Sequence, residues 1–322
     1  MSRPPGATVG GQAVIEGVMM RGPDAWAVAV RRQDGIVESV THELPRLSAR
    51  SRLAKVPFVR GALVLWESLS LGMQALTWSA QRADAGDEKE MSKGQLVFSM
   101  TVALVFFLAV FMVVPLLVAG VFDDRLGDSS IVFNVIDGAV RVLLFIGYIW
   151  LIGRSKEIRR VFEYHGAEHM TIHAYEAGDP LDQVEIGKYS PRHPRCGTNF
   201  LMIVVLLALV VFTFVGRPSL PWLIASRVLL VPVVAAVSYE LLKAAADRRW
   251  LQWASRPGMW LQSLTTRPPD PDQVEVAVAS LLAALSDPDV REVAARGPMA
   301  YSSPAARVEV PDDDGAPLPG NG

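Results

Sequence analysis

The chain has 322 residues, a formal charge of -2 and a mean hydropathy of +0.28, and 51% of its residues are hydrophobic. The near-neutral net charge and the lack of a long block of Lys or Arg exclude nucleic acid as the expected partner. The single cysteine, Cys196, excludes an intrachain disulfide. Residues 1–7 lack the charged, apolar and small-residue regions of a cleavable signal peptide, so we expect the N-terminus to stay inside the cell.

Residues 8–48 are expected to form a small cytoplasmic β unit. Two β-branched runs flank Asp34-Gly35, which is a hairpin signal. The earlier stretch 10–23 is rich in glycine and carries one acid, Glu16, and one base, Arg21. Such a backbone can form an anion-binding nest, but turns in a sheet need the same glycines, and we favour turns. If this stretch folds against the histidine-rich segment described below, Glu16 and Arg21 belong to its site.

Residues 53–81 are apolar and aromatic but are interrupted by Arg60 and Glu67. Charges in the middle of a segment disfavour a membrane span, whereas aromatic residues suit the membrane interface. We therefore predict an amphipathic helix that lies on the membrane.

Four apolar segments are each long enough to cross the roughly 30 Å of hydrocarbon in a bilayer: 96–122, 131–152, 199–215 and 220–242. The chain is therefore predicted to be a mostly α-helical integral membrane protein with a four-helix transmembrane region over 96–242. Lys and Arg residues follow the second and fourth segments, and this bias predicts that both termini and the connection 153–198 face the cytoplasm. Interfacial and amphipathic helices over 243–290 and a disordered tail over 297–322 are expected to follow.

The charged residues within the predicted spans include Asp137, Arg141 and Arg227. Asp137 and Arg227 each lie about seven residues, or about 10 Å, from the outer ends of spans that run in the same direction, so they can pair across the bundle. Arg141, one helical turn from Asp137, is the competing partner. A buried pair that fixes helix register is favoured over an ion relay, which these charges also allow.

Three of the five histidines lie in the stretch 163–176, four residues apart. On a helix, His165, His169 and His173 are displaced by about 40° from one to the next and share one face, and two acids flank it, Glu168 and Glu176. Two histidines four residues apart can bind one divalent ion, and His165-Gly-Ala-Glu-His169 has the order of inverted zincins, whose carboxylate is the general base. His165 and His173 lie about 12 Å apart along the axis, too far for one ion unless the helix breaks. The sequence therefore leaves three interpretations open: a site for one ion, a site for two ions, or an ordinary polar helix face.

The loop 189–199 leads from this stretch into the third predicted span and carries His193 and Cys196. Its prolines favour an extended chain that can fold back over the histidine helix and supply a further ligand. Cys196 lies between Arg195 and a helix N-terminus, an environment that lowers a thiol pKa, so a Cys/His nucleophilic pair is a second possibility. A small apolar role for the cysteine is equally expected.

Four motifs follow one another in a fixed order within residues 8–285: Gly10-Gly-Gln-Ala-Val-Ile-Glu-Gly-Val-Met-Met-Arg-Gly-Pro23, Glu163-Tyr-His-Gly-Ala-Glu-His169, Pro191-Arg-His-Pro-Arg-Cys-Gly-Thr-Asn199 and Pro257-Gly-Met-Trp-Leu-Gln-Ser-Leu-Thr-Thr-Arg267. Together they resemble the YqhQ-like bacterial membrane proteins, a family of unknown function that is often labelled a predicted metal-dependent enzyme. The resemblance implies a multi-pass protein of the bacterial cytoplasmic membrane and, through that label, a metal at the histidine stretch. It implies no substrate.

The leading hypothesis is a cytoplasm-facing, metal-dependent enzyme, most plausibly a hydrolase. His165 and His169 would hold a divalent ion, and Glu168 would take a proton from a bound water whose pKa the ion lowers to about 7. Candidates for the third ligand are His193, Cys196 and Glu176, and His173 would lie outside the ligand shell or bind a second ion. A thiolate favours zinc, whereas iron or manganese suits an all His/Glu site equally well. The substrate would be a lipid head group, a lipid-linked intermediate or a juxtamembrane peptide.

Two other functions stay open. In a non-catalytic membrane scaffold or metal-responsive regulator, the ion would staple the segment 153–197 through a closed four-ligand site. An ion or solute transporter would use the intramembrane charges, although no inverted repeat is visible. A homo-oligomer could supply the missing walls of such a path.

Overall fold

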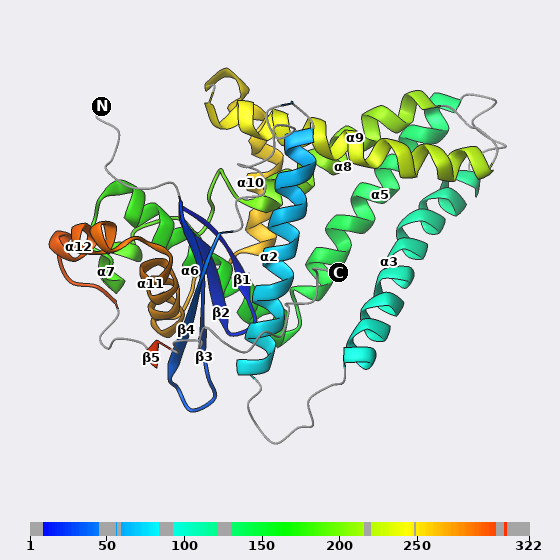
Figure 1. Cartoon of the computed structure of the whole chain (residues 1–322). Coiled ribbons are helices and arrows are strands. Elements are labelled where there is room, and N and C mark those ends of the chain that lie inside the picture. The colour runs from blue at the N-terminus through cyan, green and yellow to red at the C-terminus, as the bar shows by residue number, and fades with distance from the viewer. Residues whose placement is uncertain are drawn as a thin grey trace.

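The computed structural model describes residues 9–44, 56, 59–83, 93–121, 130–215, 220–247, 249–300 and 306–307. Figure 1 shows two regions, a β-sheet with helices on both faces and a group of long helices beside it. Segments from both ends of the chain and from its middle build the sheet region. Residues far apart in the sequence therefore meet there.

The sheet contains the β unit predicted near the N-terminus. Its antiparallel strands are β1 (Gly10–Val14), β2 (Gly17–Arg21), β3 (Ala25–Arg31) and β4 (Val37–Glu43). A short strand, β5 (Ala306–Arg307), pairs in parallel with β4, and the order is β1-β2-β3-β4-β5. The predicted turn at Asp34-Gly35 places Gly35 at a φ of 85°, which glycine adopts without a steric penalty.

The two faces of the sheet bury different side chains because successive residues of a strand point to opposite sides. Small residues such as Ala27 and Ala29 face α6 (Lys156–Ala177) and α11 (Pro271–Ala284). Larger residues such as Trp26 face α2 (Val59–Ala83) on the other side. The small side chains allow α11 to come close, and the Ser280 hydroxyl donates a 3.2 Å hydrogen bond to the carbonyl oxygen of Ala27.

Helix α2 contains most of the segment expected to lie on the membrane. One side packs Leu71 and Ala75 on the sheet, and Gly61 lies against the ring of Tyr239 in α9 (Leu220–Asp247). The other side exposes large apolar residues: Trp66, Leu69, Met73 and Leu76. The helix thus belongs to the sheet region, and contact of its exposed side with a membrane stays a prediction.

Both charges that interrupt α2 have partners within the protein. Arg60 donates two 2.7 Å hydrogen bonds to the carboxylate of Glu240 in α9. The buried Glu67 accepts a hydrogen bond from Arg21 of β2. Arg21 therefore joins the sheet to α2.

The other region consists of α3 (Lys93–Val121), α5 (Ser130–Ile152), α8 (Gly197–Val215) and α9. Among the described residues, three helical segments are long and apolar enough to cross a membrane: Thr101–Val121, Ile131–Ile152 and Gly197–Val215. They coincide with the first three predicted spans. Helix α9 covers the fourth predicted span but is not among these segments, so the fourth crossing stays a prediction.

Asp137 and Arg141 pair with each other within α5. Arg141 Nη2 lies 3.0 and 2.9 Å from the two carboxylate oxygens of Asp137. The local partner considered from the sequence is therefore present. The side chain of Arg227 lies outside the described part of the chain.

The C-terminal segments return to the sheet region. The 3-10 helix η2 (Arg249–Ser255) and α10 (Arg256–Thr265) expose three tryptophans, Trp250, Trp253 and Trp260. Helix α11, expected to be amphipathic, is instead buried between the sheet, α6 and α7 (Gln183–Ile186). The difference arises because Val276 to Leu281 are small or apolar on every side of the helix.

Helix α12 (Asp287–Arg296) ends at Gly297, where a disordered tail was expected to begin. The N–H of Ala300 donates a 2.6 Å hydrogen bond to Leu181, and Met299 forms a parallel bridge with the same residue. Strand β5 follows at the sheet edge. The start of the expected tail is thus ordered, and residues 301–305 and 308–322 lie outside the described residues.

Candidate metal centre

Helix α6 carries the histidine stretch and is capped at both ends. The Ser155 hydroxyl accepts a 3.2 Å hydrogen bond from the N–H of Ile158, and Gly178 ends the helix with a φ of 83°. Glu168 and His169 are buried between these ends. The helical spacing predicted from the sequence is therefore present, with one face of α6 turned toward the edge of the sheet and the loop 189–196.

The rings of His165 and His169 are each held through Nδ1. His165 Nδ1 lies 2.8 Å from the carbonyl oxygen of Thr265, and His169 Nδ1 lies 2.7 Å from that of Pro191. A carbonyl oxygen only accepts, so each Nδ1 carries a proton, and in a neutral ring Nε2 then presents a lone pair. Burial lowers the pKa of His169 to about 2, which keeps this ring neutral at pH 7. Metal-ligating histidines are held in the same manner.

Cys196 brings a third donor atom to the same place. Its Sγ lies 3.2 Å from His165 Nε2, and the donor atoms of Cys196, His165 and His169 all lie within 4.8 Å of one another. The cysteine immediately precedes α8, where the N–H of Thr198 donates to Sγ at 3.4 Å. The loop therefore folds back over α6, as its sequence suggested.

The thiol of Cys196 does not have the low pKa expected near a helix N-terminus. Burial raises the pKa of Cys196, and hydrogen bonds from Thr198 offset this rise only in part. The expectation was wrong because the loss of hydration outweighs the terminal N–H groups. A bound divalent cation would reverse the balance, since it stabilises the thiolate directly.

Glu168 stands beside these donors with an unpaired oxygen. The residue is 3% exposed, and neither its Oε2 nor His169 Nε2 has a hydrogen-bond partner among the described residues. Burial raises the pKa of Glu168 to about 8, although His165 opposes the rise. Buried polar atoms without partners are costly and uncommon. Two of them beside one cavity therefore indicate a binding site.

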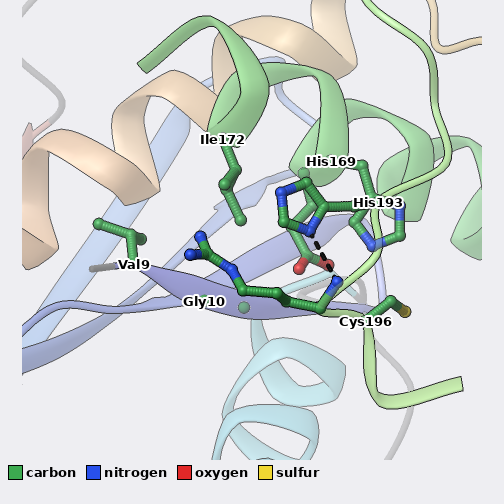
Figure 2. A pocket seen from close by; sticks show the side chains of 9 residues that line it. Val9, Gly10, His169, Ile172, His193 and Cys196 are labelled. Carbon is green, nitrogen blue, oxygen red and sulfur yellow. Dashed lines mark hydrogen bonds between the residues drawn. The ribbon is translucent and has the colours of Figure 1, made fainter. Parts of the chain in front are cut away.

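A cavity of about 40 Å³ lies between α6, the loop and the start of the sheet, with room for more than one water molecule (Figure 2). Its walls come from the chain around β1 (Val9, Gly10, Gly11), from α6 (Glu168, His169, Ile172) and from the loop (His193, Arg195, Cys196). A Cβ atom on Gly11 would lie 3.1 Å from the carboxyl carbon of Glu168 and 2.5 Å from the Met19 oxygen. Glycine at this position thus permits the close approach of β1 to α6.

The remaining predicted ligands form a second group, of which His193 also lines the cavity. His173 Nε2 lies 3.0 Å from the carbonyl oxygen of Arg192, and its ring centre is 4.4 Å from that of His193. Glu176 pairs with Arg195 and lies 3.5 Å from His193 Nε2. Among the described residues these three side chains are not part of the group that brings His165, His169 and Cys196 together.

Comparison with known proteins identifies the family. Residues 56–287 match the family described as "Protein of unknown function (DUF1385)". The chain belongs to this family. It is also 33% identical to "Uncharacterized protein YqhQ" of Bacillus subtilis (strain 168) over 291 residues, which cover 84% of this chain and 90% of the relative. No solved structure matches.

The family match includes all three donor residues and the segment after α10 that supports them. A Cβ atom on Gly166 would overlap the main-chain oxygen of Arg267, so α6 and this segment cross in direct contact. The N–H of Arg267 also donates a 2.9 Å hydrogen bond to Phe162. The crossing brings the carbonyl oxygen of Thr265 against the ring of His165.

Gln262 of α10 fixes the loop and was not identified as a site residue from the sequence. Its buried side chain accepts a 2.8 Å hydrogen bond from the N–H of His193 and donates at 2.9 Å to the carbonyl oxygen of the same residue. It also donates to Asn199 at 3.0 Å. Membership in the motif 257–267 was the only sequence signal for Gln262.

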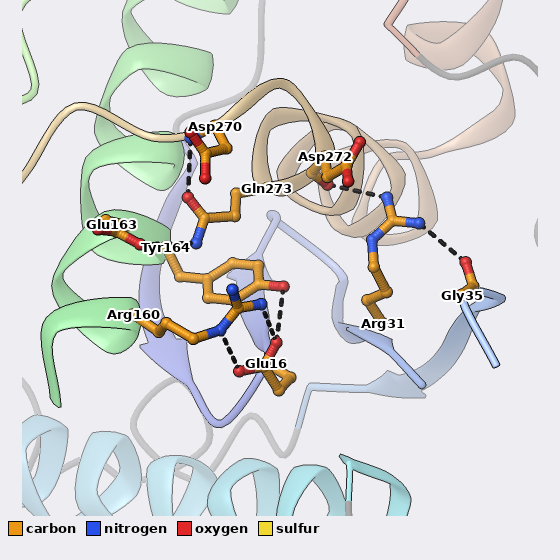
Figure 3. A network of polar contacts seen from close by, with 9 residues as sticks. All are labelled: Glu16, Arg31, Gly35, Arg160, Glu163, Tyr164, Asp270, Asp272 and Gln273. Carbon is orange, nitrogen blue, oxygen red and sulfur yellow. Dashed lines mark hydrogen bonds and ion pairs between the residues drawn. The ribbon is translucent and has the colours of Figure 1, made fainter. Parts of the chain in front are cut away.

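Glu16 belongs to a neighbouring ionic network (Figure 3). It accepts two hydrogen bonds from Arg160, one of them at 2.6 Å, and lies 3.4 Å from the hydroxyl of Tyr164. Arg21 pairs with Glu67 of α2. Both candidates for an additional site therefore hold the sheet to its helices, and neither lines the cavity.

Proposed function

We propose that this chain is a membrane-embedded, metal-dependent hydrolase whose divalent ion is held by His165, His169 and Cys196, with Glu168 as general base. One observation carries the proposal. Three donor atoms lie within 4.8 Å of one another, beside the unpaired Oε2 of a buried carboxyl group.

The donor set suits zinc best. Two neutral imidazoles and a thiolate are ligands that zinc prefers, and three protein ligands leave the fourth position for water or substrate in catalytic zinc sites. The carbonyl oxygens of Thr265 and Pro191 supply the outer hydrogen bonds that orient ligating imidazoles. Iron or manganese would suit a site that uses Glu168 in place of the sulfur.

The residues around the donors have separate tasks in this proposal. A bound zinc ion would supply Lewis-acid activation of water. Glu168 accepts the proton, because its Oε2 has no competing partner among the described residues and the residue lines the cavity together with His169 and Cys196. Burial raises the pKa of Glu168 to about 8, and a bound cation would lower it again, toward the range that suits a group that takes up and releases a proton near pH 7.

We place the site at the cytoplasmic surface of the bacterial membrane. Cys196 directly precedes α8, one of the helices long and apolar enough to cross a membrane, so this ligand stands at the end of such a segment. The Lys and Arg residues that follow the second span favour the cytoplasmic side. Substrates available there include lipid head groups, lipid-linked intermediates and juxtamembrane peptides.

The test compares Glu168→Gln with Glu176→Gln in full-length protein purified in detergent without an affinity histidine tag and loaded with zinc. Metal content is measured by elemental mass spectrometry, and hydrolysis is measured with p-nitrophenyl acetate as a chromogenic ester. We expect Glu168→Gln to keep its zinc and to lose about 100-fold or more in rate, as for the loss of a general base. Glu176→Gln, whose carboxylate pairs with Arg195, should retain both zinc and rate.

Equal rates for wild type and Glu168→Gln, both with zinc bound, would contradict the role of Glu168. Loss of zinc in Glu168→Gln would instead make Glu168 a fourth ligand. That outcome favours the non-catalytic alternative, in which a closed site staples α6 to the loop before α8. The burial of Glu168 and Cys196 is the observation that keeps this alternative in view.

A further inference from the structure

Strand β1 forms an open edge of the sheet next to the cavity. In the described part of the chain β2 is the strand that pairs with β1, at one end of the order β1-β2-β3-β4-β5. Gly10 and Gly11 are exposed, although both line the cavity. A Cβ atom on Gly10 would meet no atom of the described residues within 4 Å.

The register shows which main-chain groups of β1 point outward. The N–H of Arg31 bonds to the carbonyl oxygen of Glu16 at 2.9 Å, so Glu16 and the even-numbered residues of β2 face β3. The odd-numbered residues of β2 then face β1, where their partners are Gly10, Gln12 and Val14. The N–H and C=O groups of Gly11 and Ala13 therefore point away from the sheet. Apart from the pairing of the strands themselves, no backbone hydrogen bond of either residue is present among the described residues.

We propose that an extended polypeptide binds this edge as an additional strand and thereby presents a peptide bond to the site formed by His165, His169 and Cys196. The inference rests on the proposed function and names its substrate class. Outward N–H and C=O groups that alternate along a strand match the donors and acceptors of another main chain. A lipid head group carries no such repeat.

Hydrolysis at this position consumes one water molecule. The C–N bond of the peptide breaks and a C–O bond forms at the acyl carbon. The proton accepted by Glu168 passes to the leaving nitrogen, so the products are a carboxylic acid and an amine. No oxidant, reductant or further reactant is needed. Gly10 and Gly11 line the same cavity as His169 and Cys196, so the cavity connects the edge of β1 with two of the three donor residues.

The experiment measures binding to the full-length, zinc-loaded protein in detergent by isothermal titration calorimetry. The probes are N-acetylated tetrapeptide hydroxamates that alternate alanine with valine, leucine or phenylalanine, and the same peptides with N-methyl groups on alternate amides. Acetohydroxamate serves as a chelator without a strand. Because two main-chain hydrogen bonds are lost, we expect N-methylation to weaken binding about tenfold.

Ala13→Pro removes one outward N–H and leaves the bonds between β1 and β2 in place, as edge strands tolerate proline. It should lower the affinity for the unmethylated peptides to that for the methylated ones, whereas Ala13→Val should not. Acetohydroxamate should bind all forms equally. If Ala13→Pro fails to fold, the methylated and unmethylated probes on the wild-type protein decide.

Acetohydroxamate binding without any difference between methylated and unmethylated peptides would overturn the inference and leave the metal site standing. Displacement of acetohydroxamate by anionic lipid vesicles, with no effect of the peptides, would overturn it in favour of a lipid substrate. Absence of both zinc and acetohydroxamate binding would overturn the proposed function, and the inference with it.

Discussion

Two carboxylates have opposite environments: Glu168, which belongs to α6, and Glu16, which pairs with an arginine of α6. Glu16 is partly exposed and is paired with Arg160. Glu168 is buried, forms no ion pair among the described residues and keeps one oxygen without a partner. Burying such a group costs free energy unless something compensates. The difference teaches that Glu16 serves the fold, whereas Glu168 keeps an unpaired oxygen that the proposed metal site would use.

Other charges in the molecule follow the pattern of Glu16. Asp137 is paired with Arg141 inside α5, although it lies in a segment apolar enough to cross a membrane. Glu67 also has one unpaired oxygen, but its other oxygen is bound to Arg21. What sets Glu168 apart is its combination of burial, missing arginine partner and three neighbouring donor atoms.

The largest expected effect separates the two environments through metal content. His169→Ala removes a donor that Pro191 holds in place, and we expect zinc affinity to fall by more than about 100-fold, beyond the loss typical of outer-shell partners. His42→Ala is the matched control, because His42 stacks on Trp26 at 4.7 Å, away from the cavity. The zinc content of the two variants is measured by elemental analysis after dialysis against a weak chelator. Equal zinc in the two variants would break the comparison.

A smaller effect is expected for the ion pair between Glu16 and Arg160. Glu16→Gln weakens the pair with Arg160, whose side chain is 47% exposed, so we expect a loss of about 1 kcal/mol or less in the free energy of unfolding. Zinc content should not change. Thermal unfolding followed by circular dichroism, with metal analysis of the same samples, tests this. Zinc loss in Glu16→Gln would show that the two environments are coupled.

The smallest effect concerns pH. Burial lowers the pKa of His42 from its ordinary value of 6.5. Below pH 6.5 the unfolded chain therefore binds a proton at His42 more readily than the folded chain does. The contribution of His42 to the free energy of unfolding is thus complete above pH 6.5 and is lost as the pH falls through the pKa of His42 in the folded protein. We expect His42→Phe to flatten the acid limb of the stability profile measured by denaturant unfolding. Identical slopes for wild type and His42→Phe would contradict this.

Local patterns were enough to predict the hairpin of β3 and β4, the first three apolar spans and the histidine face of α6, whereas the glycine-rich stretch for which turns were favoured contains β1 and β2. The hairpin signal at Asp34-Gly35 and the four-residue spacing of His165 and His169 depend only on neighbours in the chain. Cys196 could be placed near them because its proline-containing loop lies between the helix and the next apolar span. These features needed no knowledge of distant contacts.

Other features depend on contacts between distant segments, which no single motif encodes. The carbonyl oxygen of Thr265 reaches His165 only because α6 and the segment after α10 cross at Gly166. Gln262 holds the loop from 69 positions away in sequence. Glu176 projects between the histidines on a helical wheel, but the helix rise carries it about 10 Å beyond His169, where it pairs with Arg195.

The most direct test of the central claim is zinc X-ray absorption spectroscopy on the full-length, zinc-loaded protein, beside Cys196→Ala prepared in the same way. The account predicts one sulfur at about 2.3 Å and nitrogen or oxygen neighbours at about 2.0 to 2.1 Å in the wild type, with the sulfur absent in Cys196→Ala. A wild-type spectrum without sulfur, or protein that binds no zinc under these conditions, would contradict the account.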